Sequence, residues 1–254
     1  MTRAFLPAAR FKARLKAGEA LACHWLQLGA PALAELAGEA GPDAVVIDMQ
    51  HGLWDRAGLE AAVGAVGEAS AVLVRTADQS ASAIGQALDA GATGVIAPLV
   101  NTPAEARAVV AAAHFPPRGV RSAGAPRTLI DFAAYRRAAQ SDLVAAVMIE
   151  TGEAVEAAGA IAATPGLDLI FIGPGDLAIS LGAGAGDAAF EAALARVLAA
   201  GREAGVAVGV FTHDVEQALA RAAQGFQFTV FVSDVELNRG HARAQWERFA
   251  AGRR

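Results

Sequence analysis

Two acidic residues, Glu150 and Asp176, each end a run of mostly apolar residues. The two runs, 143–150 and 167–176, are rich in β-branched side chains and bounded by Gly and Pro, which is typical of buried strands in a parallel sheet. The stretch 152–163 between them is rich in Ala and Glu and predicts the helix of a βαβ unit. Both acids would then lie at the carboxyl ends of neighbouring strands, where two oxygen ligands can hold a divalent metal that keeps water for a substrate to displace. The alternative is that each acid only caps the helix that follows it.

Two further apolar runs end in groups that could act on a small substrate. His51 follows the expected strand 44–49 and is next to Gly52, which lets the backbone approach a ligand closely. Arg75 lies at the end of the expected strand 71–76, where a planar guanidinium can hold a small carboxylate through two parallel hydrogen bonds. Taken singly, such a histidine is more often packed or solvated, and such an arginine more often pairs with an acid. Four polar strand ends at matching depth nevertheless predict a functional site.

These side chains can meet only if their strands lie side by side in one sheet. The chain alternates short apolar runs with helical stretches, and a capping box at 102–105 marks one of the helix starts. This pattern predicts an α/β fold, a (β/α)8 TIM barrel that forms one domain over residues 1–254. The expected strands are 21–28, 44–49, 71–76, 94–98, 143–150, 167–176, 206–211 and 226–232, and the expected helices include 8–16, 31–39, 55–68, 80–90, 126–139 (in part loop), 152–163, 187–204, 215–223 and 237–250.

Composition excludes several classes of protein. The chain has 254 residues, which fit one large barrel or two small domains, and no apolar run reaches the roughly 18 residues of a membrane span. A formal charge of −5 with no basic cluster argues against nucleic acid and anionic membranes as partners. The N-terminal stretch carries basic residues, Arg3 among them, but no apolar core of signal-peptide length, so we expect a cytoplasmic protein. With Cys23 as the only cysteine, there is no intrachain disulfide and no zinc site built on cysteines.

The lysines narrow the chemistry further. The only two, Lys12 and Lys16, fall in the expected N-terminal helix, far from any strand end. A Schiff base with a carbonyl substrate is therefore excluded, and carbonyl chemistry at this site would use a metal. The glycine-rich stretch 182–186 lacks the spacing of a dinucleotide fingerprint and is interpreted as a loop.

Seven short motifs at strand ends and in loops occur in the same order and with the same spacing as in a known protein family. Together the resemblance covers roughly residues 5–250. The motifs are Trp25-Leu26, Asp48-Met49-Gln50-His51-Gly52, Val74-Arg75, Gly94-Val95-Ile96-Ala97-Pro98, Phe115-Pro116-Pro117-Arg118-Gly119-Val120-Arg121, Ile149-Glu150-Thr151 and Phe171-Ile172-Gly173-Pro174-Gly175-Asp176-Leu177. In these motifs the chain resembles the HpcH/HpaI aldolases, the class II metal-dependent pyruvate aldolases that cleave 4-hydroxy-2-oxo acids.

The resemblance implies a role for each of these residues. Glu150 and Asp176 would bind Mg²⁺ or Mn²⁺, with Co²⁺ as a further candidate. Arg75 would stabilise an enolate-like transition state, and His51 would serve as the base. Asp89 matches the acid that raises the basicity of the histidine.

Asp89 nevertheless precedes the expected strand 94–98 and so belongs at the amino-terminal face of its own barrel. It can meet a histidine only if the geometry departs from this barrel or the histidine belongs to a neighbouring subunit.

The resemblance also implies which groups contact the substrate. These are Trp25, Arg75, Met148, Gly175 (through its backbone) and Asp176. Met148 stands where the family commonly has Gln, and because side chains alternate along a strand it should face the same way as Glu150.

A second departure is Gln50, where many members have Glu. Both departures leave the donor substrate open.

The resulting hypothesis is an aldolase that reversibly cleaves 4-hydroxy-2-oxo acids to an aldehyde and pyruvate, or a close analogue such as hydroxypyruvate. One alternative is an acyl-CoA lyase of the citrate lyase β-subunit type, which would need a basic groove for the phosphates of CoA. Another is a barrel that binds a keto acid without catalysis. Metal-dependent release of pyruvate from a hydroxy-oxo acid separates the three.

The last expected helix, 237–250, bears on assembly. Ala242, Trp246, Phe249 and Ala250 form one apolar stripe on it. The stripe could cover the gap between the first and last strands of its own barrel. The resemblance implies instead that this helix is swapped between two subunits, and that three such dimers form a hexamer.

Overall fold

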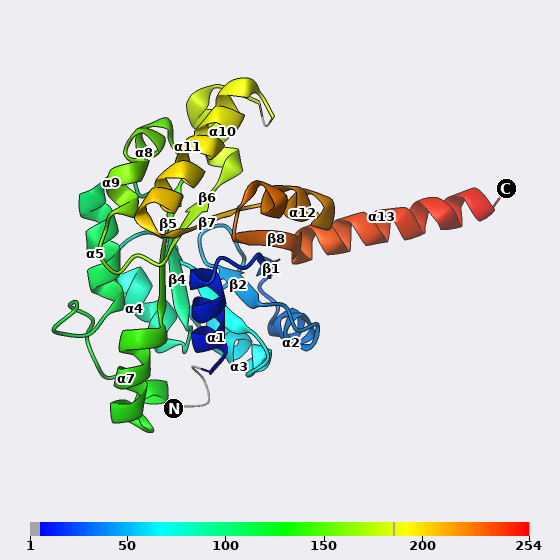
Figure 1. The fold of residues 1–254 in the computed structure, drawn as a ribbon. Helices are drawn as coiled ribbons and strands as arrows, with labels where there is room; N and C mark the ends of the chain where they lie inside the picture. Colours follow the sequence, from blue (N-terminus) through cyan, green and yellow to red (C-terminus); the bar gives the residue numbers. More distant parts are fainter. Residues whose placement is uncertain (1–5, 185, 254) are drawn as a thin grey trace.

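Eight parallel strands close into a barrel in the computed structural model, which describes residues 6–184 and 186–253 (Figure 1). Neighbours in the barrel are also neighbours in the chain, and β8 pairs with β1. This confirms the predicted (β/α)8 TIM barrel. Arg3 and Ala185, which belong to segments discussed above, lie outside the described residues. The strands are β1 (Leu21–Leu26), β2 (Ala44–Asp48), β3 (Ala71–Arg75), β4 (Gly94–Ala97), β5 (Val144–Ile149), β6 (Leu169–Ile172), β7 (Ala207–Val210) and β8 (Phe228–Ser233).

Helices surround the barrel, and their starts follow from local sequence. The predicted capping box is confirmed, since the Thr102 side chain accepts from the backbone of Glu105 and the Glu105 side chain accepts in return. No helix in the described part of the chain combines the length and the apolarity that a membrane crossing requires. The helices are α1 (Leu6–Lys16), α2 (Pro31–Glu39), α3 (Arg56–Val66), α4 (Ala81–Asp89), α5 (Pro103–Ala113), α6 (Pro126–Leu129), α7 (Phe132–Asp142), α8 (Gly152–Glu156), α9 (Ala158–Ala162), α10 (Pro174–Leu181), α11 (Ala188–Ala204), α12 (Val215–Gln224) and α13 (Asp234–Gly252).

Helix α1 closes the amino-terminal end of the barrel. Phe11 and Leu15 belong to the same buried cluster as the inward-facing strand residues, and the ring of Phe11 packs edge-on against Phe228 at 5.2 Å. The ammonium group of Lys12 donates to the backbone oxygen of Leu143 and to the carboxylate of Asp168 at 2.9 Å. The opposite, carboxyl-terminal end therefore remains as the face where strand-end side chains can reach solvent.

Two segments next to the candidate site differ from the expected secondary structure. The sequence Gly173-Pro174-Gly175-Asp176, expected as a strand end, begins the short helix α10, with Pro174 in its first turn. The expected helix 152–163 is two short helices, α8 and α9, separated at Ala157, whose ψ of 0° leaves the helical range. Both changes lie next to the strand ends that carry Glu150 and Asp176.

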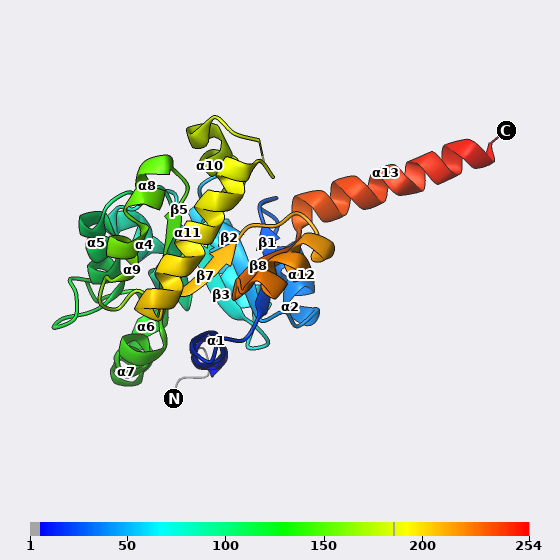
Figure 2. The same cartoon turned by 45° about the horizontal axis from the view of Figure 1, so that its top comes forward.

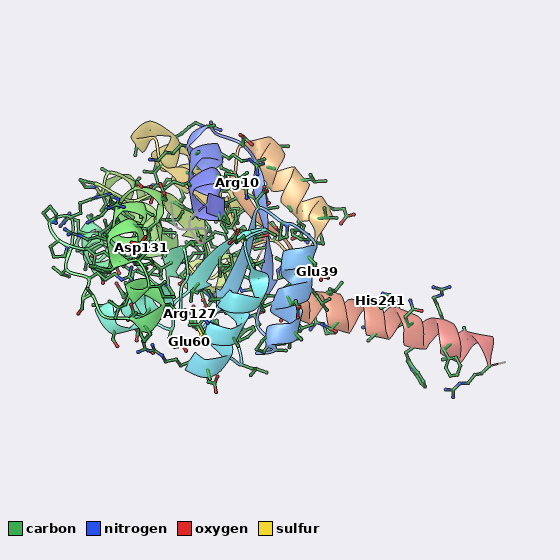
Figure 3. All side chains as sticks on the ribbon, turned by 90° about the horizontal axis from the view of Figure 1, so that it is seen from below. Arg10, Glu39, Glu60, Arg127, Asp131 and His241 are labelled. Atoms are coloured by element: carbon green, nitrogen blue, oxygen red, sulfur yellow. The ribbon has the colours of Figure 1, made fainter. Side chains whose placement is uncertain are left out.

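Helix α13 projects away from the barrel (Figures 1 and 2). Its first turn is anchored because the carboxylate of Asp234 accepts from the backbone N–H groups of Gln27 and Leu28, each at 2.9 Å. Beyond that turn the helix is exposed, and Trp246 and Phe249 each keep 59% of their surface accessible. His241 also lies on the projecting part (Figure 3). The interpretation in which the apolar stripe covers its own barrel is therefore wrong.

Candidate active site

Asp48 and Arg75 form a buried ion pair at the carboxyl end of the barrel. They face each other in the register of β2 and β3. The Nε atom of Arg75 donates to Oδ1 of Asp48 at 2.8 Å, and Nη2 donates to Oδ2. The guanidinium is thus held in one plane by a two-pronged contact. Its Nη1 atom has no hydrogen-bond partner among the described residues and is available to a ligand.

Asp48 collects further donors around this pair. Its carboxylate accepts from Nε2 of Gln27 at 3.0 Å and from the backbone N–H groups of Gln50 and His51. Burial by itself would raise the pKa of the Asp48 carboxyl, but the hydrogen bond and charge of Arg75 hold that pKa below its usual value. Sequence reasoning did not assign Asp48 a role. The available signal was an acid that ends an apolar strand, as Glu150 does.

Trp25 supports Arg75 from beneath. The guanidinium carbon lies 5.2 Å from the centre of the indole ring, and the indole N–H donates to Asp48 at 3.3 Å. The indole is stacked on Phe171 with ring centres 5.5 Å apart. With only 1% of its surface exposed, Trp25 fixes the position of Arg75 from within the barrel.

Glu150 is a buried carboxylate with one free oxygen. Its Oε1 accepts from the backbone N–H of Leu99 at 2.7 Å, whereas Oε2 has no hydrogen-bond partner in the described part of the chain. Leu99 has a φ of +55°, a conformation that non-glycine residues adopt at a cost and that aims this N–H at the carboxylate. Burial raises the pKa of the Glu150 carboxyl, and the nearby charge of Asp176 raises it further. An orphaned buried oxygen beside a second carboxylate fits a divalent cation.

Asp176 lies in the first turn of α10 and is exposed. Within residues 6–184 and 186–253 no group of three or more His, Cys, Asp and Glu side chains could hold a metal ion. Glu150 and Asp176 would therefore supply two ligands, and water and substrate oxygens would fill the other positions, as is usual for Mg²⁺.

Gly173 makes the space that this site needs. A Cβ atom at that position would lie 2.3 Å from Oε2 of Glu150 and 3.0 Å from Cε of Met148. The predicted common orientation of Met148 and Glu150 is thereby confirmed. Met148 keeps 2% of its surface exposed and belongs to the inner cluster of the barrel, so the wall beside the free oxygen is a thioether. Gly175 follows in α10 and is exposed, with open space around its Cα.

His51 and Asp89 lie at opposite ends of one barrel. His51 follows β2 at the carboxyl end, is exposed, and is tied to Asp48 through its own backbone N–H. Asp89 ends α4 just before β4, and its carboxylate pairs with the buried Arg121 at 3.1 Å. Within one chain the structure therefore brings Arg75, Glu150, Asp176 and Met148 to one face and leaves Asp89 at the other.

Comparisons with known proteins agree with this architecture. The sequence profile described as HpcH/HpaI aldolase/citrate lyase matches residues 21–239. A hydroxypyruvate/pyruvate aldolase of Rhizorhabdus wittichii is 38% identical over 225 residues, which cover 86% of this chain and 90% of that protein. A 4-hydroxy-2-oxovalerate aldolase of Novosphingobium aromaticivorans is 37% identical over 211 residues, covering 79% and 80%. The crystal structure of a protein of the same family from Burkholderia cenocepacia superposes with a TM-score of 0.86 at 34% identity, covering 94% and 98% of the two chains.

Proposed function

Because this chain belongs to the HpcH/HpaI aldolase/citrate lyase family and is a lyase of the aldolase type, we propose that it reversibly cleaves 4-hydroxy-2-oxo acids to an aldehyde and pyruvate or hydroxypyruvate. The observation that carries the proposal is the buried carboxylate of Glu150, whose Oε2 has no partner among the described residues and faces the same end of the barrel as Arg75. The names of the two relatives support both donor substrates.

Glu150 and Asp176 are the proposed ligands of a divalent metal, Mg²⁺ or Mn²⁺. When bound, such an ion supplies Lewis-acid polarisation of the 2-oxo group. The pKa of Glu150 stays raised because burial outweighs the lowering effects of the Leu99 N–H group and of the Arg75 charge, and a bound cation would relieve this condition.

Arg75 is proposed to stabilise the negative charge that develops on the keto oxygen. Two of its nitrogens are engaged by Asp48, so Nη1 can face the substrate in a fixed plane. A donor that is already oriented does not have to reorganise during the reaction, and such a donor contributes most to transition-state stabilisation.

His51 is the proposed base for the C3 proton of the donor. It lies on the same face as Arg75, on a loop whose backbone is held by Asp48. Asp89 can assist a histidine only across a subunit boundary, since the two lie at opposite ends of one barrel. We propose this pairing between chains as part of a hexameric assembly of three swapped dimers.

A retro-aldol assay tests the proposal. The purified protein should release pyruvate from 4-hydroxy-2-oxovalerate only when Mn²⁺ or Mg²⁺ is present, and EDTA should abolish the release. An acyl-CoA lyase would instead cleave a carbon–carbon bond of an acyl-CoA substrate, and a keto-acid-binding barrel would bind pyruvate without turnover. Release of pyruvate at an unchanged rate in EDTA would contradict the proposed metal site.

A further inference from the structure

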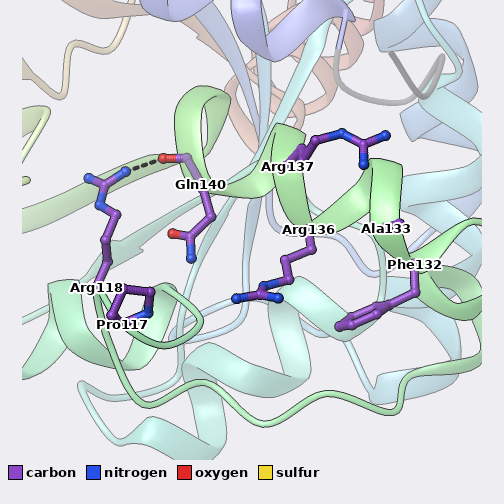
Figure 4. Close-up of a pocket in the computed structure, with 7 residues that line it drawn as sticks. All are labelled: Pro117, Arg118, Phe132, Ala133, Arg136, Arg137 and Gln140. Atoms are coloured by element: carbon purple, nitrogen blue, oxygen red, sulfur yellow. Dashed lines mark hydrogen bonds between the residues drawn. The ribbon is translucent and has the colours of Figure 1, made fainter.

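A groove at the amino-terminal end of the barrel lies far from the proposed active site. It has a volume of about 630 Å³, within the range of pockets that hold small molecules. Helix α7 and the turn after α5 form it, and in Figure 1 α7 and the active-site helix α10 lie at opposite ends of the molecule. Figure 4 shows the lining residues, which are Pro117, Arg118, Phe132, Ala133, Arg136, Arg137 and Gln140.

The polar part of this groove is almost entirely cationic. None of Arg118, Arg136 and Arg137 has a carboxylate within 4.0 Å among the residues that the structure describes. Elsewhere on the surface an arginine such as Arg221 pairs with a carboxylate, that of Glu191, at 2.7 Å. The unneutralised guanidinium groups of Arg118 and Arg136, with that of Arg137 at the rim, make a positive potential in a chain whose formal charge is −5.

Two of these arginines are oriented by the backbone. Nη1 of Arg118 donates to the carbonyl of Gln140, and Nη2 of Arg136 donates to the carbonyl of Pro116 at 3.1 Å. Each contact uses one nitrogen and leaves the other donors of the fork available. In Figure 4 the Arg136 side chain extends toward the space between Pro117 and Phe132, while Arg137 extends the other way. Arg118 and Arg136 are thus pre-oriented donors, and Arg137 adds charge at the rim.

The positive charge of Arg118 affects the pKa values of two buried neighbours. The pKa values of Lys12 and His114 are lowered mainly by burial, and the positive charge of Arg118 lowers both further. An anion bound beside Arg118 would relieve this repulsion.

The floor of the groove is apolar. Phe132 packs edge-on against Phe115 with ring centres 5.7 Å apart and keeps part of its surface accessible. Pro117 is exposed on the other side of the Arg136 head group. An apolar floor with guanidinium groups above it suits an organic body that carries a multiply charged anion, because planar forks match the oxygens of phosphate.

We propose that this groove binds a phosphorylated small molecule of the nucleoside diphosphate class. Its phosphates lie between Arg118 and Arg136, and its ring lies over Phe132. The site is separate from the proposed aldolase site and does not depend on it.

Titration calorimetry of the whole protein with ADP and with pyrophosphate, in EDTA, tests the proposal. Both probes should bind, ADP more tightly because its ring also contacts Phe132. The double substitution Arg118→Gln and Arg136→Gln should weaken both by about tenfold or more, the scale of two lost charge-assisted contacts. Arg107→Gln is the matched control, since Arg107 is an exposed arginine on α5 outside the groove, and it should leave both affinities unchanged.

Two results would overturn the proposal. One is that neither probe binds at millimolar concentration. The other is that the double variant binds both probes as the parent does, which would place the anion elsewhere. Circular dichroism and melting of the double variant, whose two altered side chains are exposed, establish that it is folded.

Discussion

Arg75 and Asp48 face each other across β3 and β2, with Nε of the arginine 2.8 Å from Oδ1 of the aspartate. Both side chains are buried, and the indole of Trp25 lies under the guanidinium at 5.2 Å. The Arg75 side chain is therefore constrained in three ways: by the Asp48 carboxylate, by the Trp25 ring and by the strand β3 that carries it. The consequence is a donor with a fixed plane and a free Nη1 at the end of the barrel where Glu150 has its free oxygen.

The substitution Arg75→Lys should separate charge from geometry. Lysine keeps the positive charge but cannot bond Asp48 and a substrate oxygen in one plane. We expect kcat for pyruvate release to fall by about 10- to 1000-fold, the scale of one lost transition-state donor. Steady-state kinetics measures this, and the melting temperature serves as the control for folding. A lysine variant with the parent kcat would show that the planar fork has no catalytic role.

The substitution Asp48→Asn should weaken the folded state in a pH-dependent way. The folded-state pKa of Asp48 is lowered by Arg75, so its carboxylate contributes stability that is present above the unfolded pKa of about 3.9 and is lost as the pH falls through the folded value. Near neutral pH the variant leaves the Arg75 charge buried without its counter-ion, which should cost about 3–5 kcal/mol of unfolding free energy.

Urea denaturation of parent and Asp48→Asn protein checks this prediction. The difference in unfolding free energy should be largest near neutral pH and should shrink toward about pH 3. A difference that is equal at both pH values would mean that Asp48 is not a stabilising anion.

The substitution Glu150→Gln tests the proposed metal site without relying on turnover. Mn²⁺ should raise the melting temperature of the parent, because a ligand that binds only the folded state stabilises it. The variant should lose this shift together with its activity. In metal-free buffer near neutral pH it should melt no lower than the parent, since the amide removes a buried charge beside Asp176.

The control is Glu153→Gln, which changes an exposed acid three residues away on α8 and should keep the full Mn²⁺ shift. An equal Mn²⁺ shift in the parent and in Glu150→Gln would remove Glu150 from the metal site.

The barrel was predictable because each strand is a short apolar run with turn residues at its ends. Helix α2 has the predicted bounds, since Pro31 marks its start and the apolar period runs to Glu39. The strand-end rule also located Glu150 and Arg75 on one face. Helix α10 was missed because its first residues, Pro174 and Gly175, are turn formers whose helical role depends on the loop geometry around them.

Ion pairs between side chains that are distant in the chain could not be predicted from the hydrophobic periodicity. Asp48 could be seen as a strand-end acid, but its choice of Arg75 as partner depends on the register of β2 and β3. Likewise, nothing near Asp89 in the chain indicates that Arg121, on the loop after α5, is its partner. The groove beside α7 could not be predicted from the sequence, because its arginines are spread over two segments and make no basic cluster.

Helix α13 gives the last prediction. It leaves the barrel after one anchored turn at Asp234, and Trp246 and Phe249 remain 59% exposed on a helix with little else to pack against. Exposed aromatic pairs of this kind mark surfaces that bind another protein, and the identical helix of a second copy, swapped onto this barrel, is the proposed partner.

The substitution Trp246→Glu places a charge in that contact and should convert the proposed hexamer into smaller species with reduced activity. Arg243→Glu, on the same helix but largely off the apolar stripe, is the comparison and should leave the assembly intact, because among the described residues Arg243 pairs with Glu247 alone, at 2.9 Å. Sedimentation velocity reports the outcome directly. A parent protein that sediments as a fully active monomer of 25.7 kDa would show that α13 needs no second subunit.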